Sequence, residues 1–269
     1  MSVLLSVDKL EIRTPGRTLV SDISFSIAAG ERVGLIGESG SGKSLTALAV
    51  LGLVPDSMRV GGSVLLDGHQ VIGARDRALV PLRGTSVAVV FQEPMTALDP
   101  LMRIGHQVGE VVRRRAMRDG IPCGVEEISR RVLTLLERVA LAEAHRIARA
   151  FPHEISGGQR QRAAIAMALA CRPKLLIADE PTTALDVTTQ MDVLNLLKGL
   201  VRDEAMGLLF ISHDLPVVAS IATRALVMRD GTLIEEGPVA TLFDRPSHPY
   251  TESLVAAARA FDAALEMRQ

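Results

Sequence analysis

The sequence predicts an α/β protein with a mostly parallel core sheet, an N-terminal antiparallel β subdomain and a helical insert subdomain. Residues 3–36 alternate apolar and polar positions in short runs, residues 103–149 change to helical periodicity, and strands alternate with helices over residues 174–222. Such alternation favours a parallel sheet covered by helices. With 269 residues, 48% of them hydrophobic, the chain can bury a sizeable core in one large α/β domain or two small ones.

The N-terminal strands are separated by predicted turns at Pro15-Gly16 and Ala29-Gly30. They lead into the apolar run 32–36, which is typical of a buried strand and precedes a helical run at 45–51. Further short strands are expected at residues 63–66 and 87–91. The sequence therefore predicts a β-rich beginning that ends in one buried strand and one helix.

A glycine-rich segment lies between that buried strand and that helix. It is Gly37-Glu38-Ser39-Gly40-Ser41-Gly42-Lys43-Ser44, the pattern Gly-x-x-x-x-Gly-Lys-Ser. The glycines let the backbone wrap around an anion, so that N–H groups and the positive end of the helix face it. Lys43 then reaches the β and γ phosphates of a nucleotide, and the Ser44 hydroxyl is left to bind Mg²⁺. A glycine-rich turn with a chance lysine is disfavoured, because both spacing and context fit.

The rest of the chain continues the α/β pattern. Three helices are expected over residues 103–149, with breaks near Gly120-Ile121-Pro122 and Leu141-Ala142. They form a helical insert between two parts of one nucleotide domain. The expected elements after it are a strand at 174–179, a helix at 188–202, a strand at 208–212, a helix at 215–222 and a hairpin at 224–236 that turns at Asp230-Gly231.

Two carboxylates, Asp179 and Glu180, end the apolar strand at 174–179. The carboxyl edge of the sheet is where open α/β folds bind ligands. Asp179 suits a Mg²⁺ ligand, directly or through water, and Glu180 suits the group that orients or deprotonates an attacking water. The alternative is an acidic cap between strand and loop, and the phosphate-binding pattern earlier in the chain argues against it.

Composition excludes several classes of protein. Lys and Arg number 30 against 31 Asp and Glu, and the chain has one Tyr and no Trp, so nucleic acid is not expected as a partner. No apolar stretch approaches the roughly 20 residues that span a bilayer, and the first residues lack a charged signal region. A location in the cytosol or at a membrane surface is therefore expected. Cys123 and Cys171 lack metal-ligand spacing and receive no role.

Over nearly its whole length the chain resembles the nucleotide-binding subunits of ABC transporters, which are P-loop NTPases of ABC type. Four segments carry the resemblance besides the glycine-rich loop: Phe91-Gln92-Glu93-Pro94, Ser156-Gly157-Gly158-Gln159-Arg160, Thr183-Ala184-Leu185-Asp186, and His213 after a predicted strand. The resemblance implies that Gln92 senses the γ-phosphate and the membrane partner and joins the Mg²⁺ ligands. It also implies that His213 contacts the γ-phosphate, although a lone histidine is more often structural.

The other two segments imply a dimer. In the family, the segment that matches Ser156, Gly157, Gly158 and Gln159 contacts the γ-phosphate of ATP held by the opposite subunit, and Asp186 lies in the loop that couples the two sites. The physical chemistry agrees, because Ser156 is suited to cap a helix starting at Gly157, whose first amides then form an anion site.

The chain departs from the family pattern where adenine is expected to stack. Many members place an aromatic residue in the loop between the first two strands, but residues 13–17 contain none. Thr14 and Arg17 are therefore the expected base contacts, with the Arg17 guanidinium as the stacking group. Selectivity for ATP over GTP is left open.

The loop 90–100 and Phe151-Pro152-His153-Glu154 are similar to those of oligopeptide, dipeptide and nickel importers. Pro246-Ser247-His248-Pro249-Tyr250-Thr251, with the helical run 252–264, resembles the C-terminal extension of that branch, although a turn and docking helix would explain it physically. We therefore expect an ABC ATPase domain at 1–245, with its helical insert at about 103–160, and a C-terminal tail at 246–269.

No cysteine follows Tyr250, so no iron–sulfur site is expected. Arg113-Arg114-Arg115 is interpreted as a solvated helix face, with contact to anionic lipid as the alternative.

The resemblance implies a subunit that binds and hydrolyses ATP with Mg²⁺ and powers import of a small solute, an oligopeptide, a dipeptide or a nickel chelate. Its implied partners are integral membrane permease subunits, a second ABC ATPase subunit and, indirectly, an extracytoplasmic solute-binding protein, at the cytoplasmic face of the cell membrane. The alternatives are an ABC exporter subunit and a soluble ABC ATPase acting on nucleic acid or a protein assembly. The cargo, and whether the dimer is homo or hetero, are left open.

Overall fold

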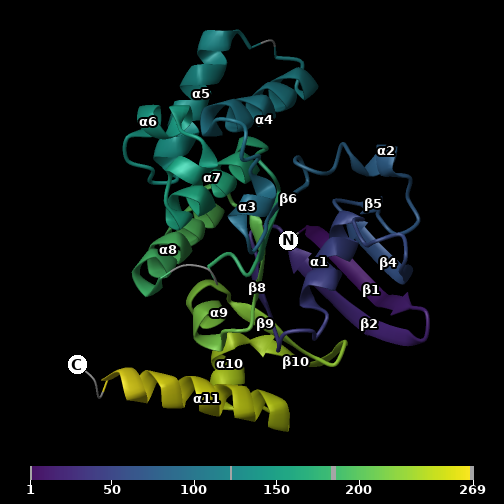
Figure 1. Cartoon of the computed structure of the whole chain (residues 1–269). Helices are drawn as coiled ribbons and strands as arrows, with labels where there is room; N and C mark the ends of the chain where they lie inside the picture. The colour runs from purple at the N-terminus through teal and green to yellow at the C-terminus, as the bar shows by residue number, and fades with distance from the viewer. Residues whose placement is uncertain (1, 122, 183–185, 267–269) are drawn as a thin grey trace. The chain divides into compact units, whose positions relative to one another are not determined.

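The computed structural model describes residues 2–121, 123–182 and 186–266, and the chain divides into two compact units (Figure 1). Unit 1 combines residues 1–83 with residues 205–269, and unit 2 is residues 84–204. No helix in the described part of the chain is long and apolar enough to cross a membrane.

The N-terminal strands of unit 1 form a four-stranded antiparallel sheet in the order β2-β1-β4-β5. Its strands are β1 (Val3–Thr14), β2 (Arg17–Ala28), β4 (Arg59–Leu66) and β5 (His69–Gln70). This confirms the predicted antiparallel subdomain. Strand β4 begins four residues before the expected 63, because Gly62 enters at a register shift opposite β1, with φ at +85°. A Cβ at Gly62 would lie 2.2 Å from the Lys9 carbonyl oxygen, so the close approach of β1 requires glycine there.

The remaining strands of unit 1 are mostly parallel. Strand β3 (Arg32–Ile36) pairs in parallel with β8 (Gly207–Ser212) on one side and with β9 (Arg224–Arg229) on the other, and β10 (Thr232–Pro238) pairs antiparallel with β9. Asp230 and Gly231 make the expected turn, both with positive φ. The helices of unit 1 are α1 (Lys43–Leu51), α2 (Asp76–Leu79), α9 (Leu215–Ile221), α10 (Val239–Asp244) and α11 (Pro249–Glu266).

Gly34 lets helix α9 pack directly on β3. A Cβ at Gly34 would lie 2.1 Å from Cγ1 of the fully buried Val218 and 3.4 Å from Cβ of Ala222. We expect Gly34→Ala to lower the free energy of unfolding by about 1–3 kcal/mol, because overpacking displaces a close-packed helix. The melting temperature should fall by about 2–4 °C per kcal/mol in a protein of this size. Calorimetry measures both quantities.

The matched control is Gly199→Ala, at a helical glycine whose added Cβ meets nothing within 4 Å. It should leave stability unchanged or raise it, because alanine favours a helix. Adding Val218→Ala to Gly34→Ala should recover part of the loss. Equal melting temperatures for Gly34→Ala and the parent chain would contradict the packing argument.

Unit 2 contains the two parallel strands β6 (Val87–Val90) and β7 (Leu175–Asp179) and most of the helices. The three predicted insert helices are α4 (Ile104–Arg118), α5 (Val125–Arg138) and α6 (Ala144–Arg149). The chain breaks between them as expected, with Gly120 at φ +70° after α4. The other helices of the unit are α3 (Pro94–Ala97), the 3₁₀ turn η1 (Pro152–Glu154), α7 (Gly157–Ala170) and α8 (Val187–Asp203).

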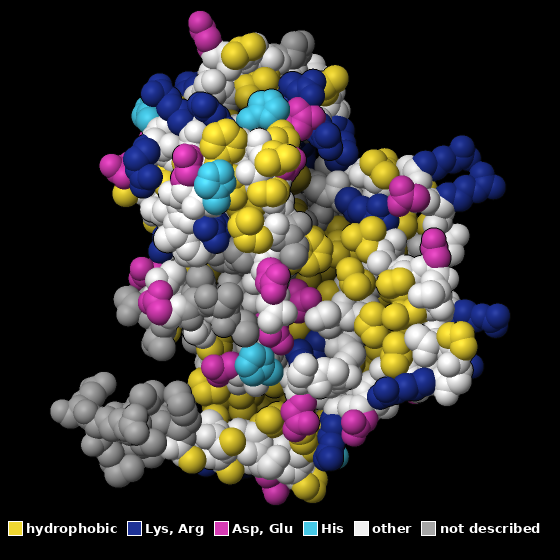
Figure 2. Space-filling view, in the orientation of Figure 1, with side chains coloured by type: hydrophobic (Ala, Val, Ile, Leu, Met, Phe, Trp, Pro, Cys, Tyr) yellow, Lys and Arg dark blue, Asp and Glu magenta, His cyan; other side chains and the backbone are white. Residues whose placement is uncertain are grey.

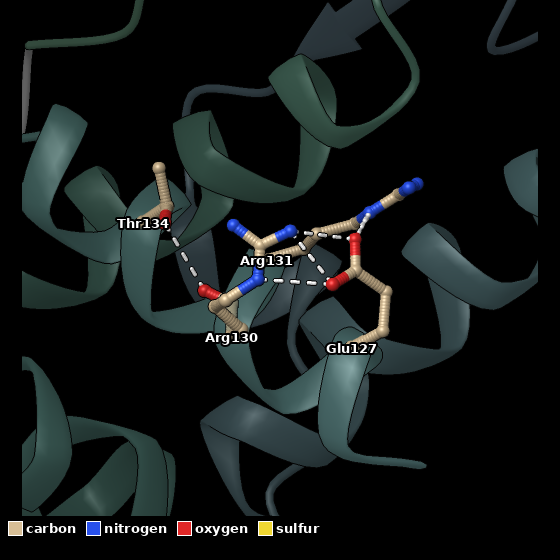
Figure 3. Close-up of polar contacts among 4 residues, drawn as sticks. All are labelled: Glu127, Arg130, Arg131 and Thr134. Atoms are coloured by element: carbon tan, nitrogen blue, oxygen red, sulfur yellow. Dashed lines mark hydrogen bonds and ion pairs between the residues drawn. The ribbon is translucent and has the colours of Figure 1, made fainter. Parts of the chain in front are cut away.

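Charged side chains on the insert helices are largely neutralised within their own helices. Glu127 accepts hydrogen bonds from Arg130 and Arg131 one turn further along α5, as Figure 3 shows. On α4, Glu110 pairs with both Arg113 and Arg114. Lys and Arg side chains lie among Asp and Glu on the face of the molecule seen in Figure 2. These pairs favour the solvated-face interpretation of the arginine run over lipid contact.

Candidate nucleotide-binding and hydrolysis site

The phosphate loop, residues 37–44, connects β3 to α1 as predicted. Gly40 and Gly42 both have positive φ, +82° and +101°. A Cβ at Gly37 would lie 2.3 Å from the Met228 carbonyl oxygen and 2.7 Å from Ser41 Oγ. The tight curl of the loop against β9 thus requires glycine at its first position.

Lys43, the first residue of α1, is only 4% exposed. Its ammonium Nζ donates to the carbonyl oxygens of Gly37 at 2.8 Å and Glu38 at 2.9 Å. Because a buried cation needs such partners, the loop curls around its own lysine. The ammonium is therefore held at the centre of the loop.

The loop has the groups that an anion requires. Gly42 is the N-cap residue of α1, and no side chain caps the helix there, so its first N–H groups are left to the loop side. Ser41 Oγ is buried and lacks a hydrogen-bond partner in the described part of the chain. Ser44 is exposed on the first turn of the same helix. These residues fit a phosphate chain, with one hydroxyl left for a metal ion.

His213 lies at the same edge of the sheet as the phosphate loop. Ile36, the last residue of β3, is paired in parallel with Ser212, the last residue of β8. His213 follows and is exposed, while Asp214 caps α9 by accepting the Val217 N–H at 3.2 Å. Within unit 1, the carboxyl ends of two neighbouring strands therefore carry the loop and the histidine, which is the edge where such sheets bind ligands.

In unit 2, Gln92 and Glu180 lie together. Strands β6 and β7 are in register at Val90 and Ala178, and Gln92 and Glu180 each come two residues later. The Gln92 side-chain amide donates to the Glu180 carboxylate at 3.2 Å. Glu180 has φ +46°, a left-handed conformation that is costly for a residue with a side chain and is common at functional sites. Asp179 ends β7 and is half-buried.

Ser156 caps α7 as the sequence predicts. Its Oγ accepts the Gln159 N–H at 3.3 Å, and Gln159 Oε1 accepts the Ser156 N–H at 3.0 Å. The reciprocal bond makes a capping box, which the spacing Ser-x-x-Gln signals and which was not expected from the sequence. Gly158 packs against α8, where its added Cβ would lie 2.5 Å from Thr189 Cγ2. Gly157 is exposed.

Asp186 has a local structural role besides any functional one. It caps α8, accepting the Thr189 N–H at 3.0 Å and the Thr189 hydroxyl at 2.7 Å. Residues 183–185 of the predicted coupling segment lie outside the described residues. The two expected base contacts lie at the β1–β2 turn, where the Thr14 hydroxyl donates to the Arg17 carbonyl oxygen at 3.3 Å and Arg17 is exposed.

One contact of the loop was missed entirely from the sequence. The Tyr250 hydroxyl oxygen accepts the N–H of Glu38 at 3.1 Å, across 212 residues of chain. Burial of the ring and the neighbouring Glu38 carboxylate raise the pKa of Tyr250, while the Glu38 N–H and Arg229 act in the opposite direction. The phenol therefore stays neutral at physiological pH.

A parallel strand that ends in a curled glycine loop with a buried lysine, and an apolar strand that ends in a carboxylate, are the features of a P-loop nucleotide-binding protein. The chain belongs to the ABC transporter family, whose model matches residues 20–183. The predicted fold class and the stated resemblance are both confirmed.

Two similar proteins are named for oligopeptide transport and peptide import. The chain is 43% identical over 266 residues to the oligopeptide transport ATP-binding protein OppD of Salmonella typhimurium, which covers 97% of this chain and 78% of that protein. It is 44% identical over 271 residues to a putative peptide import ATP-binding protein of Brucella melitensis, covering 96% of this chain and 77% of the relative.

Solved structures show the same fold. The cassette MJ0796, in a dimer bound to ADP and Pi, matches with a TM-score of 0.75 and 28% identity, covering 87% of this chain and 98% of that one. The protein cbiO1 of Clostridium perfringens, part of the transporter complex cbiONQ, matches with a TM-score of 0.76 and 26% identity, covering 91% and 92%. The chain is thus an ATP hydrolase of the ABC type.

Proposed function

We propose that this chain is the ATP-hydrolysing subunit of a peptide importer and drives a membrane permease from the cytoplasmic face. The observation that carries the proposal is 43–44% identity over nearly the whole chain to proteins named for oligopeptide transport and peptide import. These names favour peptides over nickel chelates as cargo.

The roles within one subunit follow from each residue's own surroundings. Lys43 and the loop N–H groups hold the phosphates of ATP. Ser44, Gln92 and Asp179 carry the oxygens that would hold Mg²⁺, which would offset the charge on the phosphates. Water attacks the γ-phosphorus, the bond to the β–γ bridging oxygen breaks, and Glu180 orients the water and takes its proton. The Gln92–Glu180 hydrogen bond at 3.2 Å supports this assignment, because it holds the carboxylate in one orientation. His213 contacts the γ-phosphate.

A second ATPase subunit completes each site. The capped first turn of α7, Ser156 to Gln159, meets the γ-phosphate held by the opposite subunit, and Asp186 couples the two sites. Ser156 and Gln159 bond each other here, so they present the N–H groups of Gly157 and Gly158 in a fixed arrangement. The partner is a second copy of this chain or a related subunit, and an extracytoplasmic binding protein delivers the cargo.

Base selectivity rests on Thr14 and Arg17 in this proposal. The Thr14 hydroxyl already bonds the Arg17 carbonyl, so the Arg17 guanidinium is the group that remains to stack on adenine. Competition of GTP against labelled ATP measures the selectivity, and equal affinities would exclude adenine specificity.

The partners are tested by purification. Tagged Glu180→Gln, expressed in the native host and trapped with Mg-ATP, is purified from solubilised membranes, and mass spectrometry identifies what is bound. Untagged cells and the same sample without nucleotide are the controls. Two multi-spanning permease subunits, with or without a second ATPase, are expected. Recovery of soluble partners alone would overturn the transporter assignment while leaving the ATPase chemistry intact.

A further inference from the structure

The described part of the C-terminal tail, residues 246–266, reaches the phosphate loop through the side chain of Tyr250. Tyr250, in the first turn of α11, is 6% exposed, and its hydroxyl oxygen accepts the Glu38 N–H at 3.1 Å. Helix α11 packs on α9, which covers β3 and β8 (Figure 1). The tail therefore packs on the helix that covers the strand leading into the loop.

The bond from Tyr250 falls on one particular peptide group. The N–H of Glu38 and the carbonyl of Gly37 belong to the same planar unit, and that carbonyl accepts from Lys43 Nζ at 2.8 Å. The peptide group is therefore held on one side by the tail and on the other by the lysine. Because hydrogen bonds at the two ends of a peptide group strengthen each other, loss of the tyrosine bond loosens the group that holds the ammonium.

The tail is fixed independently of the loop. The Glu235 carboxylate on β10 accepts the N–H groups of Ser247 at 2.7 Å and His248 at 3.1 Å. His248 Nδ1 accepts the Tyr250 N–H at 3.1 Å, and the Arg229 guanidinium lies 4.9 Å from the centre of the Tyr250 ring. These contacts already fix the position of the Tyr250 side chain. Little further conformational entropy is therefore lost when its hydroxyl bonds to Glu38.

We infer that Tyr250 is a positioning residue of the nucleotide site, which orients the Gly37–Glu38 peptide so that Lys43 is placed to receive phosphate. The inference rests on ATP binding by the phosphate loop, as in the proposed function. It assigns the tail a role in nucleotide affinity, with the chemical step left to other groups.

The first test is Tyr250→Phe, which removes the hydroxyl and keeps the ring over Arg229. We expect the KM and Kd for ATP to rise about three- to tenfold, the range of one lost hydrogen bond, with kcat within about twofold of the parent. The control is Ser253→Ala, which removes a bond of the same helix, from Ser253 Oγ to the Tyr250 carbonyl at 2.7 Å, without reaching the loop. It should leave KM unchanged.

The second test uses the unmodified protein. Tyr250 is the only tyrosine and the chain has no tryptophan, so the intrinsic emission reports on this hydroxyl. Inorganic tripolyphosphate, which does not absorb with tyrosine, should change the emission saturably, and the change should be absent in Lys43→Ala. Emission that stays constant while an independent assay shows tripolyphosphate bound would overturn the inference.

The outcomes separate this inference from the proposed function. An unchanged KM in Tyr250→Phe, or equal effects of Tyr250→Phe and Ser253→Ala, would contradict the positioning role in a chain that still hydrolyses ATP. A parent chain that does not hydrolyse ATP would instead contradict the proposed function. A fall in kcat with constant KM would also exclude Tyr250 as a residue that acts through binding.

Discussion

Glu180→Gln is expected to abolish steady-state ATP hydrolysis while leaving ATP binding intact. Glutamine keeps the size of the side chain but cannot accept a proton from the attacking water, and general base catalysis contributes about 10²–10⁴-fold. The hydrogen bond to Gln92 depends on an oxygen that the glutamine retains, so the local geometry should survive. Phosphate release measures turnover, and equilibrium binding of labelled ATP measures affinity.

The matched control for this prediction is Glu126→Gln, at a glutamate in the exposed first turn of α5. It changes the charge by the same amount and should hydrolyse ATP at the parental rate. Turnover within a few-fold of the parent in Glu180→Gln would remove Glu180 from the role of general base, whatever its position next to Gln92.

Lys43→Ala is expected to lower the affinity for ATP by roughly 10²-fold or more. The ammonium is nearly buried, and removing it deletes the positive charge and leaves two inward carbonyl oxygens, those of Gly37 and Glu38, without their donor. Truncating one member of a buried charged contact costs about 2–5 kcal/mol. Isothermal titration with ATP measures the loss, and thermal unfolding without nucleotide shows whether the fold is kept.

Lys43→Met provides the comparison that separates charge from packing, because methionine fills much of the space of the lysine stem. It should bind ATP as poorly as the alanine variant but melt at a higher temperature. Lys9→Ala, at an exposed lysine on β1, should bind as the parent does. Affinity within about threefold of the parent in both Lys43 variants would contradict a phosphate-binding role.

Much of the fold follows from local patterns. Local sequence patterns predict the strands at 3–36, the three insert helices and the hairpin at Asp230-Gly231. Alternation, helical period and turn residues each depend only on residues close together in the sequence. The phosphate loop and the cap at Ser156 were predicted for the same reason. Element type is a local property at these positions, and the structure agrees.

Features that depend on distant contacts were not predictable in this way. The Tyr250–Glu38 hydrogen bond joins residues 212 positions apart, and the early start of β4 depends on how closely β1 approaches Gly62. Helix α11 begins at Pro249, three residues before the expected start, because proline is well tolerated in a first turn. The sequence assigns the His-Pro-Tyr segment by resemblance to a C-terminal extension, and no local pattern there indicates its contact with the loop.

In the proposed function, ATP hydrolysis by this chain drives peptide uptake. The direct measurement is uptake of isotope-labelled oligopeptides by cells of the native host in which the gene is deleted and then restored as the parent sequence or as Glu180→Gln. We expect that deletion abolishes uptake of at least one peptide class, that the parent restores it and that Glu180→Gln, present at the same level, does not. Uptake of every peptide class at the parental rate in the deletion strain would contradict it.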